Sequence, residues 1–338
     1  MVHSIDQTRA EFEHILGKQV RELNLKIEGS PLEKFVHQLY RELEQKGLKK
    51  FRPLCYLTDE WGCPSGEPVV GIPFYLADAQ LSALEKEMND LEDPREIMMY
   101  LRHEAGHAFN YAYLLYRSPE WRELFGSFRR SYRDNYRPIP FSRKYVRHMA
   151  GWYAQKHPDE DFAETFAVWL TPRSNWRKKY KWWPAMPKLR YMERIAKHVG
   201  NLDPPRRRGR PDITVENMES TVGEFYLLSE PQENPLEGIA LDTDLLDMFN
   251  VSKRRKNSVR PANELLHEHR KSVVDKITYW TGVQRPLVKK LVELIEKRLQ
   301  ELGLKAETKR ESEYLTEVTA YATTLAMNYL TRGKFMHP

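Results

Sequence analysis

Two histidines and a glutamate in the run His103-Glu104-Ala105-Gly106-His107 have the spacing of a metal site with a general base beside it. In a helix, residues i and i+4 lie on one face, so both imidazoles can bind one ion. Glu104 is offset by one residue and can reach a water molecule on the ion without being a ligand. This arrangement is typical of zinc peptidases, in which the glutamate acts as the general base.

A catalytic zinc ion needs a third protein ligand and an open fourth position. Glu160 and Glu164 are four residues apart in a segment with a helical pattern, residues 158–170. One carboxylate can bind the metal, and the other can accept a hydrogen bond from a ligand histidine. Asp159 and Asp161 belong to the same first turn, and we interpret them as carboxylates that suit the positive end of the helix dipole.

The segment that carries the histidines has a strong helix start. Asp93 is the expected N-cap, Pro94 occupies the first turn, and Glu96 completes a capping box. The pattern predicts a helix from Pro94 to about Tyr116. Within it, Gly106 leaves room for another backbone to pack close to the ion.

The remaining segments predict a mainly helical α+β fold with a small antiparallel sheet. Pro73 cannot donate a ladder hydrogen bond, so its strand belongs at a sheet edge, where an extended substrate could pair with it. The predicted helices are 5–16, 31–46, 94–116, 158–170, 186–199, 262–281, 286–302 and 311–332, and the predicted strands are 51–57 and 69–76.

A change in composition divides the chain of 338 residues. Proline, glycine and arginine are concentrated just after residue 202, and residues 203–225 are predicted to be a basic linker. The linker separates a first domain, residues 1–202, from a helical C-terminal domain, residues 226–338. The metal-site motifs lie in the first of these domains.

The linker itself offers a second kind of chemistry. Arg206, Arg207, Arg208 and Arg210 stand in the run Arg-Arg-Arg-Gly-Arg-Pro, whose last four residues resemble the core of an AT-hook. Such arms insert arginines into narrow A·T minor grooves, so binding of nucleic acid through these residues is one hypothesis. A solvated basic linker is the simpler interpretation.

The composition is typical of a water-soluble protein. Hydrophobic residues make up 41% and charged residues 30%, with a mean hydropathy of −0.70 and a formal net charge of +6. There is no apolar run long enough for a membrane helix and no apolar core of a signal peptide, so a cytoplasmic location is expected. Cys55 and Cys63 match neither a zinc ribbon nor a disulfide framework and are expected to be free thiols.

The two runs His103-Glu104-x-x-His107 and Glu160-x-x-Ala163-Glu164 together resemble the gluzincins. Within that group the chain looks like the bacterial zinc-binding metallopeptidases and is similar to the catalytic domain of anthrax lethal factor. The resemblance covers about residues 50–200 and implies a zincin-like peptidase domain.

The resemblance also implies a role for each site residue. Glu160 corresponds to the third zinc ligand, and Glu164 to the glutamate that supports a ligand histidine. A tyrosine seven residues before the third ligand stabilises the oxyanion in the lethal-factor type, and Tyr153 holds that position. The long segment between the two motifs departs from thermolysin-like members and leaves the substrate open.

The leading hypothesis is a zinc-dependent metallopeptidase that acts on a peptide or protein. The expected ligands of Zn²⁺ are His103, His107 and Glu160, with Glu104 as general base. One alternative is a catalytically inactive zinc-containing binding or regulatory protein. The other is a DNA-associated protein that acts through the AT-hook-like linker.

Overall fold

The computed structural model describes residues 14–88, 91–132, 136, 138–228, 236, 239–249, 258–333 and 335. Most of the predicted helix 5–16 lies outside these residues. The chain divides into two units, each with its own hydrophobic core. Unit 1 comprises Met1–Tyr136, Ser142–Met149 and Tyr153–Glu230, and unit 2 comprises Arg137–Phe141, Ala150–Trp152 and Pro231–Pro338.

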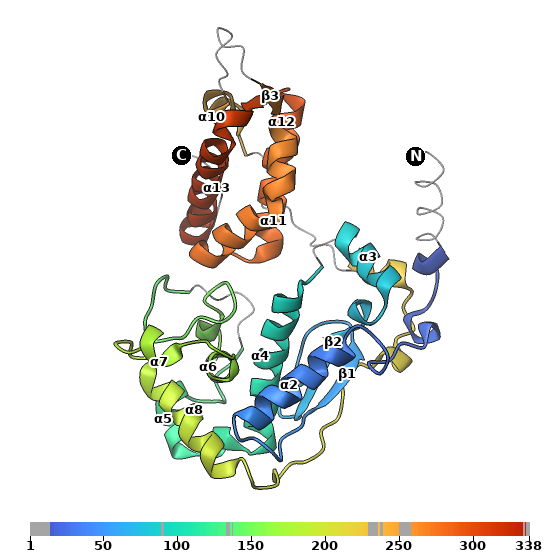
Figure 1. The fold of residues 1–338 in the computed structure, drawn as a ribbon, viewed down its shortest axis with the longest axis vertical. Helices are drawn as coiled ribbons and strands as arrows, with labels where there is room; N and C mark the ends of the chain where they lie inside the picture. The colour runs from blue at the N-terminus through green and yellow to red at the C-terminus, as the bar shows by residue number, and fades with distance from the viewer. Residues whose placement is uncertain are drawn as a thin grey trace. The chain divides into compact units, whose positions relative to one another are not determined.

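Unit 1 is mainly helical and contains one small sheet (Figure 1). Its α-helices are α2 (Glu33–Gln45), α3 (Ala79–Met88), α4 (Pro94–Ala112), α5 (Pro119–Phe125), α6 (Pro158–Leu170), α7 (Trp176–Lys179), α8 (Met186–Val199) and α9 (Val222–Leu228). Its strands are β1 (Leu54–Thr58) and β2 (Val69–Pro73), and its short 3-10 turns include η2 (Phe74–Ala77), η3 (Leu115–Arg117) and η4 (Tyr153–Gln155).

Helix α4 begins as its sequence predicts. The side chain of Asp93 accepts hydrogen bonds from the backbone N–H groups of Arg95 and Glu96, at 2.7 and 3.0 Å, and Glu96 accepts one from the Asp93 N–H at 2.9 Å. The capping box is therefore confirmed. The helix ends at Ala112, earlier than predicted, because Leu114 adopts a left-handed conformation with φ of 55°.

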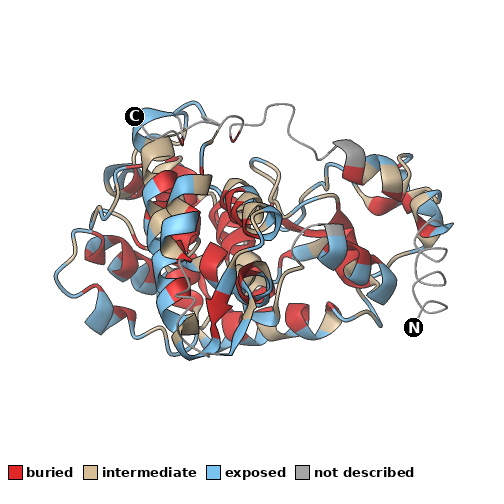
Figure 2. Cartoon of the chain, turned by 90° about the horizontal axis from the view of Figure 1, so that it is seen from above, coloured by how far each residue is buried: buried red, intermediate tan, exposed pale blue. Residues whose placement is uncertain are grey.

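Helix α6 is confirmed at its predicted bounds and lies in the interior of unit 1. Every one of its 13 residues is buried, including the acidic residues of its first turn. Phe162 and Phe166 are fully enclosed, as expected for core positions. In Figure 2, some helices are buried over most of their surface, whereas others are buried on one face and exposed on the other. A helix buried on all sides can hold charged side chains only where partners satisfy them.

The sheet of unit 1 is parallel, which corrects the predicted antiparallel sheet. β1 and β2 pair with Tyr56 opposite Gly71. The connection between the strands runs along the other edge of β2, where Gly62 lies antiparallel to Gly71 and exchanges both backbone hydrogen bonds with it, at 3.3 and 2.7 Å. The prediction was wrong because the patterns locate strands but do not reveal where their connection runs. An incoming substrate strand would meet Gly62 on this edge at Gly71.

The basic segment predicted as a linker is part of unit 1 and packs against residues 67 and 68. Arg206 forms an ion pair with Glu67, and the backbone N–H of Arg210 donates to the same carboxylate at 2.9 Å. A Cβ placed on Gly209 would lie 2.8 Å from the Pro68 ring, so this backbone lies directly against Pro68. These contacts give the arginine run a structural role, and binding of nucleic acid through it stays a prediction.

Unit 2 is a helical bundle with a short antiparallel pair of strands, and its core is formed by apolar faces of the helices. Its elements are α10 (Asp242–Met248), β3 (Val259–Pro261), α11 (Ala262–Thr281), α12 (Arg285–Glu301), β4 (Lys305–Glu307) and α13 (Glu311–Arg332). The three long helices agree with the predicted ones to within a residue or two. None of the helices in the described residues is long and apolar enough to cross a membrane.

Candidate metal centre

Helices α4 and α6 cross in direct backbone contact. A Cβ added to Gly106 would lie 2.9 Å from the Cα atom and 3.0 Å from the carbonyl oxygen of Ala163, so a larger residue would push the helices apart. In the sequence of α6, Glu160 lies three residues before Ala163, and Glu164 directly follows it. The crossing at Gly106 therefore brings both carboxylates against the histidine face of α4.

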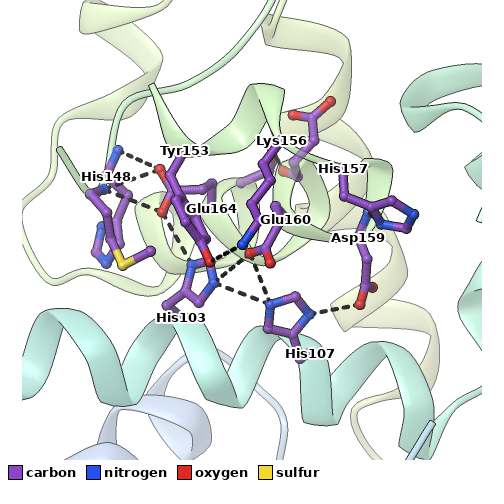
Figure 3. Close-up of polar contacts among 12 residues, drawn as sticks. His103, His107, His148, Tyr153, Lys156, His157, Asp159, Glu160 and Glu164 are labelled. Carbon is purple, nitrogen blue, oxygen red and sulfur yellow. Dashed lines mark hydrogen bonds and ion pairs between the residues drawn. The ribbon is translucent and has the colours of Figure 1, made fainter. Parts of the chain in front are cut away.

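Three side chains converge on one point at this crossing (Figure 3). Glu160 Oε2 lies 2.9 Å from His103 Nε2 and 3.2 Å from His107 Nε2, and the two nitrogens are 3.1 Å apart. All three residues are buried. An ion with bonds of about 2.0–2.1 Å in tetrahedral geometry separates its ligand atoms by about 3.3 Å. The three atoms are thus close to the separations that zinc requires.

Each histidine is oriented by a carboxylate on its other nitrogen. His103 Nδ1 lies 3.1 Å from Glu164 Oε1, and His107 Nδ1 lies 2.8 Å from Asp159 Oδ2. In a neutral imidazole whose Nδ1 donates to a carboxylate, Nε2 has a lone pair for a metal ion. Glu164 is itself held, since its oxygens accept the backbone N–H groups of His148 and Met149 at 3.0–3.2 Å. The residues present therefore fit a bound zinc ion.

Asp159 was assigned only a helix-dipole role from the sequence, and the structure adds the contact with His107. Its carboxylate also accepts hydrogen bonds from Asn110, at 2.7 Å, and from the hydroxyl of Tyr111. A count of the carboxylates needed to accept a hydrogen bond from each histidine could have indicated Asp159. Two ligand histidines need two partners, and Glu164 serves only one of them.

Tyr132 is a second residue that the patterns did not indicate. Its hydroxyl donates to Glu160 Oε1 at 2.7 Å, and its ring stacks on that of His157 at 4.1 Å between centroids. Glu160 therefore has one oxygen held by Tyr132 and the other directed at the two histidines. Tyr132 lies in a region dense in arginines and aromatics, where nothing in the sequence distinguishes it.

Glu104 is the residue that the sequence predicts to be the general base, and it directly follows His103 on α4. Its side chain is buried. Burial raises the pKa of its carboxyl group, while the neighbouring His103 and His107 lower it. In a loaded site the positive metal favours the carboxylate form, which can accept a proton.

Tyr153 lies next to His103. Its ring meets that of His103 edge to face, with 5.6 Å between centroids. Figure 3 shows the side chain reaching from η4 towards His103 and Glu160. Burial and the nearby Glu160 and Glu104 carboxylates raise the pKa of its hydroxyl, which therefore stays protonated and available as a donor.

Asp161 points away from this cluster. Its carboxylate pairs with Lys188 of α8 at 2.5 Å, and Lys188 also donates to the backbone carbonyl of Lys144 at 2.9 Å. Burial raises the pKa of Asp161 to about 7, although Lys188 opposes the shift. This residue has a structural role, in contrast to its neighbour Glu160.

The affinity for zinc is expected to rise with pH between pH 6.5 and 9. Burial lowers the pKa of His103, but its bonds to Glu160 and Glu164 outweigh burial and raise it to about 9. Below that pH a proton must leave before zinc binds, so each displaced proton changes the affinity by about tenfold per pH unit. Competition with a chelator between pH 6.5 and 9, corrected for the chelator's own protonation, measures the slope. An affinity independent of pH would contradict this assignment.

Comparison with known proteins gives a match to a protein family. The curated proteins and the solved structures yield no significant match to the chain. A family model described as "Putative zinc-binding metallo-peptidase" matches residues 66–182 of the 338, a segment that contains both motifs of the candidate metal centre. Over that segment, the chain is similar to a family of zinc-binding peptidases.

Proposed function

We propose that the chain is a zinc-dependent peptidase whose metal is held by His103, His107 and Glu160. The observation that carries the proposal is the convergence of one atom from each of these buried residues, all within 4.8 Å of one another. Two imidazoles and one carboxylate form a donor set typical of catalytic zinc, whereas structural zinc sites are mostly rich in cysteine. The family match over the same segment supports the same class of activity.

The chain's own residues divide the chemistry of amide hydrolysis between them. Zinc, when bound, supplies Lewis acidity and a water of lowered pKa. Glu104 accepts the proton of the attacking water and returns it to the leaving nitrogen. Glu164 and Asp159 hold the two imidazoles in the tautomer that leaves Nε2 free.

Tyr153 would act on the carbonyl side of the reaction. Its protonated hydroxyl can donate a hydrogen bond to the oxygen that becomes negative as the tetrahedral centre forms. The support for this role is its position next to His103, together with its place seven residues before Glu160. The gluzincin resemblance suggests the same function for this residue.

Peptidase activity should depend on bound zinc. We expect the purified chain to cleave a mixture of unstructured peptides, to lose that activity on chelation, and to regain it with one equivalent of zinc. Mass spectrometry of the products measures the cleavage. Full zinc occupancy with no cleavage in such a mixture would instead support the non-catalytic zinc protein.

The two alternatives make different demands on the structure. A non-catalytic zinc protein gives no reason for a buried carboxylate such as Glu104 beside the ligands. An AT-hook needs its Gly-Arg-Pro core free to enter a minor groove, whereas Gly209 packs on Pro68 and Arg206 pairs with Glu67. Both observations favour the peptidase.

A further inference from the structure

A lysine lies beside the candidate metal centre and has no part in the chemistry described above. Lys156 Nζ is 3.4 Å from the hydroxyl of Tyr153, and it lies over the rings of Tyr153 and Tyr132, at 5.2 and 5.5 Å from their centroids. Figure 3 shows the ammonium group next to Glu160 and Tyr153. Lys156 is thus in contact with both tyrosines of the site, Tyr132 and Tyr153.

The charge of Lys156 has no acidic partner in the part of the chain that the structure describes. No carboxylate oxygen there lies within 4.0 Å of its Nζ atom. Glu160 and Glu164 are taken by the histidines, and Glu60 interacts with Lys156 only at longer range. Since Lys156 is half-buried, its ammonium is partly removed from water, and no described carboxylate compensates it with an ion pair.

The aromatic rings hold this cation in place but leave its donors available. Cation–π contacts orient the side chain through the ring faces, whereas an ammonium has three N–H donors. One of these donors faces Tyr153, so the others can serve an anion. The ligand chemistry that suits a lysine at this position is a carboxylate.

Resting on the function proposed above, we propose that Lys156 forms an anion subsite that binds a carboxylate of the peptide substrate next to the bond to be cut. The carboxylate can come from an aspartate or glutamate side chain or from a free C-terminus. The subsite would make the enzyme selective for acidic peptides. This selectivity is a property of Lys156 and does not follow from the zinc ligands.

The simpler explanation is that Lys156 only positions Tyr153 through their 3.4 Å contact. The two explanations differ in what a change at Lys156 alters. Loss of positioning would slow the cleavage of acidic and neutral peptides equally. Loss of an anion subsite would change only the enzyme's preference between the two kinds of peptide. Lys156→Met keeps the apolar stem over the rings and removes the charge, and Lys156→Arg restores a cation.

The test uses matched peptides in the full-length protein loaded with zinc. One pair differs by glutamate against glutamine next to the scissile bond, and another pair differs by a free or an amidated C-terminus. We expect kcat/KM to favour the acidic member of one pair by about 10- to 100-fold, the size of a charge-assisted hydrogen bond. Lys156→Met should abolish this preference, Lys156→Arg should keep most of it, and Lys156→Glu should reverse it.

Lys179→Met is the matched control, because Lys179 likewise lies over a tyrosine ring, that of Tyr180 at 5.2 Å, on helix α7. This variant should leave the preference for acidic peptides unchanged. The pair that responds identifies the source of the carboxylate, because the glutamate pair reports a side chain and the amidated pair reports a C-terminus.

Binding gives a second measurement that does not need turnover. The same peptides, labelled with a fluorophore, are titrated into zinc-loaded Glu104→Gln protein with and without Lys156→Met. We expect the preference in Kd for the acidic member to disappear with Lys156→Met. An equal Kd for both members of each pair, or a preference that survives Lys156→Met, would overturn the anion subsite. Acidic binding through Lys156 without cleavage by the wild type would overturn the peptidase proposal alone.

Discussion

Glu104→Gln should lower kcat by about 10²- to 10⁴-fold, the contribution typical of a general base. The amide has the shape of the carboxylate and fits the same buried position, but it cannot accept the proton of the attacking water. The ligands His103 and His107 are unchanged, so zinc should stay bound. The measurements are kcat on a cleaved peptide and zinc per chain, made on one preparation.

Glu96→Gln is the control on the same helix. Glu96 caps the start of α4 by accepting the Asp93 N–H, so its amide should cost a little stability and leave kcat unchanged. A Glu104→Gln enzyme that contains zinc and turns over at the wild-type rate would remove the assigned base. Loss of zinc together with activity would show that Glu104 acts on the metal and not on the proton.

Replacing two neighbouring acidic residues of α6 should affect different properties, zinc affinity for Glu160 and stability for Asp161. Glu160→Ala removes one of three proposed ligands, so zinc affinity should fall by more than the roughly 10- to 100-fold that loss of a supporting carboxylate costs. Asp161→Ala should keep zinc but destabilise the fold by about 3–5 kcal/mol, because it leaves Lys188 buried without its partner. Chelator competition measures the first effect, and denaturant unfolding of the metal-free protein measures the second.

Glu160 and Asp161 can be compared directly because they are adjacent in α6 and both are buried. Lys188→Met in the Asp161→Ala background should recover much of the lost stability, since it removes the uncompensated charge. Equal losses of zinc affinity in Glu160→Ala and Asp161→Ala would show that the wrong carboxylate was chosen. Stability unaffected by Asp161→Ala would contradict the structural role of the ion pair.

Local signals were enough to predict the helices that position the site. Asp93 and Glu96 define the start of α4, and the spacing of apolar residues defines α6. Once both segments are helices, the spacing of four residues between His103 and His107 fixes one shared face. This part of the candidate site follows from helical geometry alone.

The remaining part depends on how the helices meet, which the sequence patterns do not contain. The first-turn position of Asp159 is explained equally well by the helix dipole, and only the crossing at Gly106 and Ala163 places it on His107. Tyr132 reaches Glu160 from a segment without a regular pattern. Contacts of this kind are tertiary and require the packed structure.

The parallel direction of the β1–β2 pair and the packing of the basic segment could not be predicted from the sequence for a similar reason. The pairing of Gly62 with Gly71 follows from the course of a connection that has no hydrophobic period. The run from Arg206 to Arg210 is polar, contains Gly209 and is flanked by prolines, which is typical of a free linker. Its attachment depends on Glu67, a residue of unit 1 that is far from it in the sequence.

The most direct test of the metal centre is the zinc content of the wild-type chain and of Glu160→Ala, purified and dialysed side by side. The proposed site requires one zinc ion per wild-type chain and a large loss in the variant, with Asp161→Ala retaining its zinc. A wild-type chain without zinc after loading, or a Glu160→Ala chain that retains a full equivalent, would contradict a centre built from His103, His107 and Glu160.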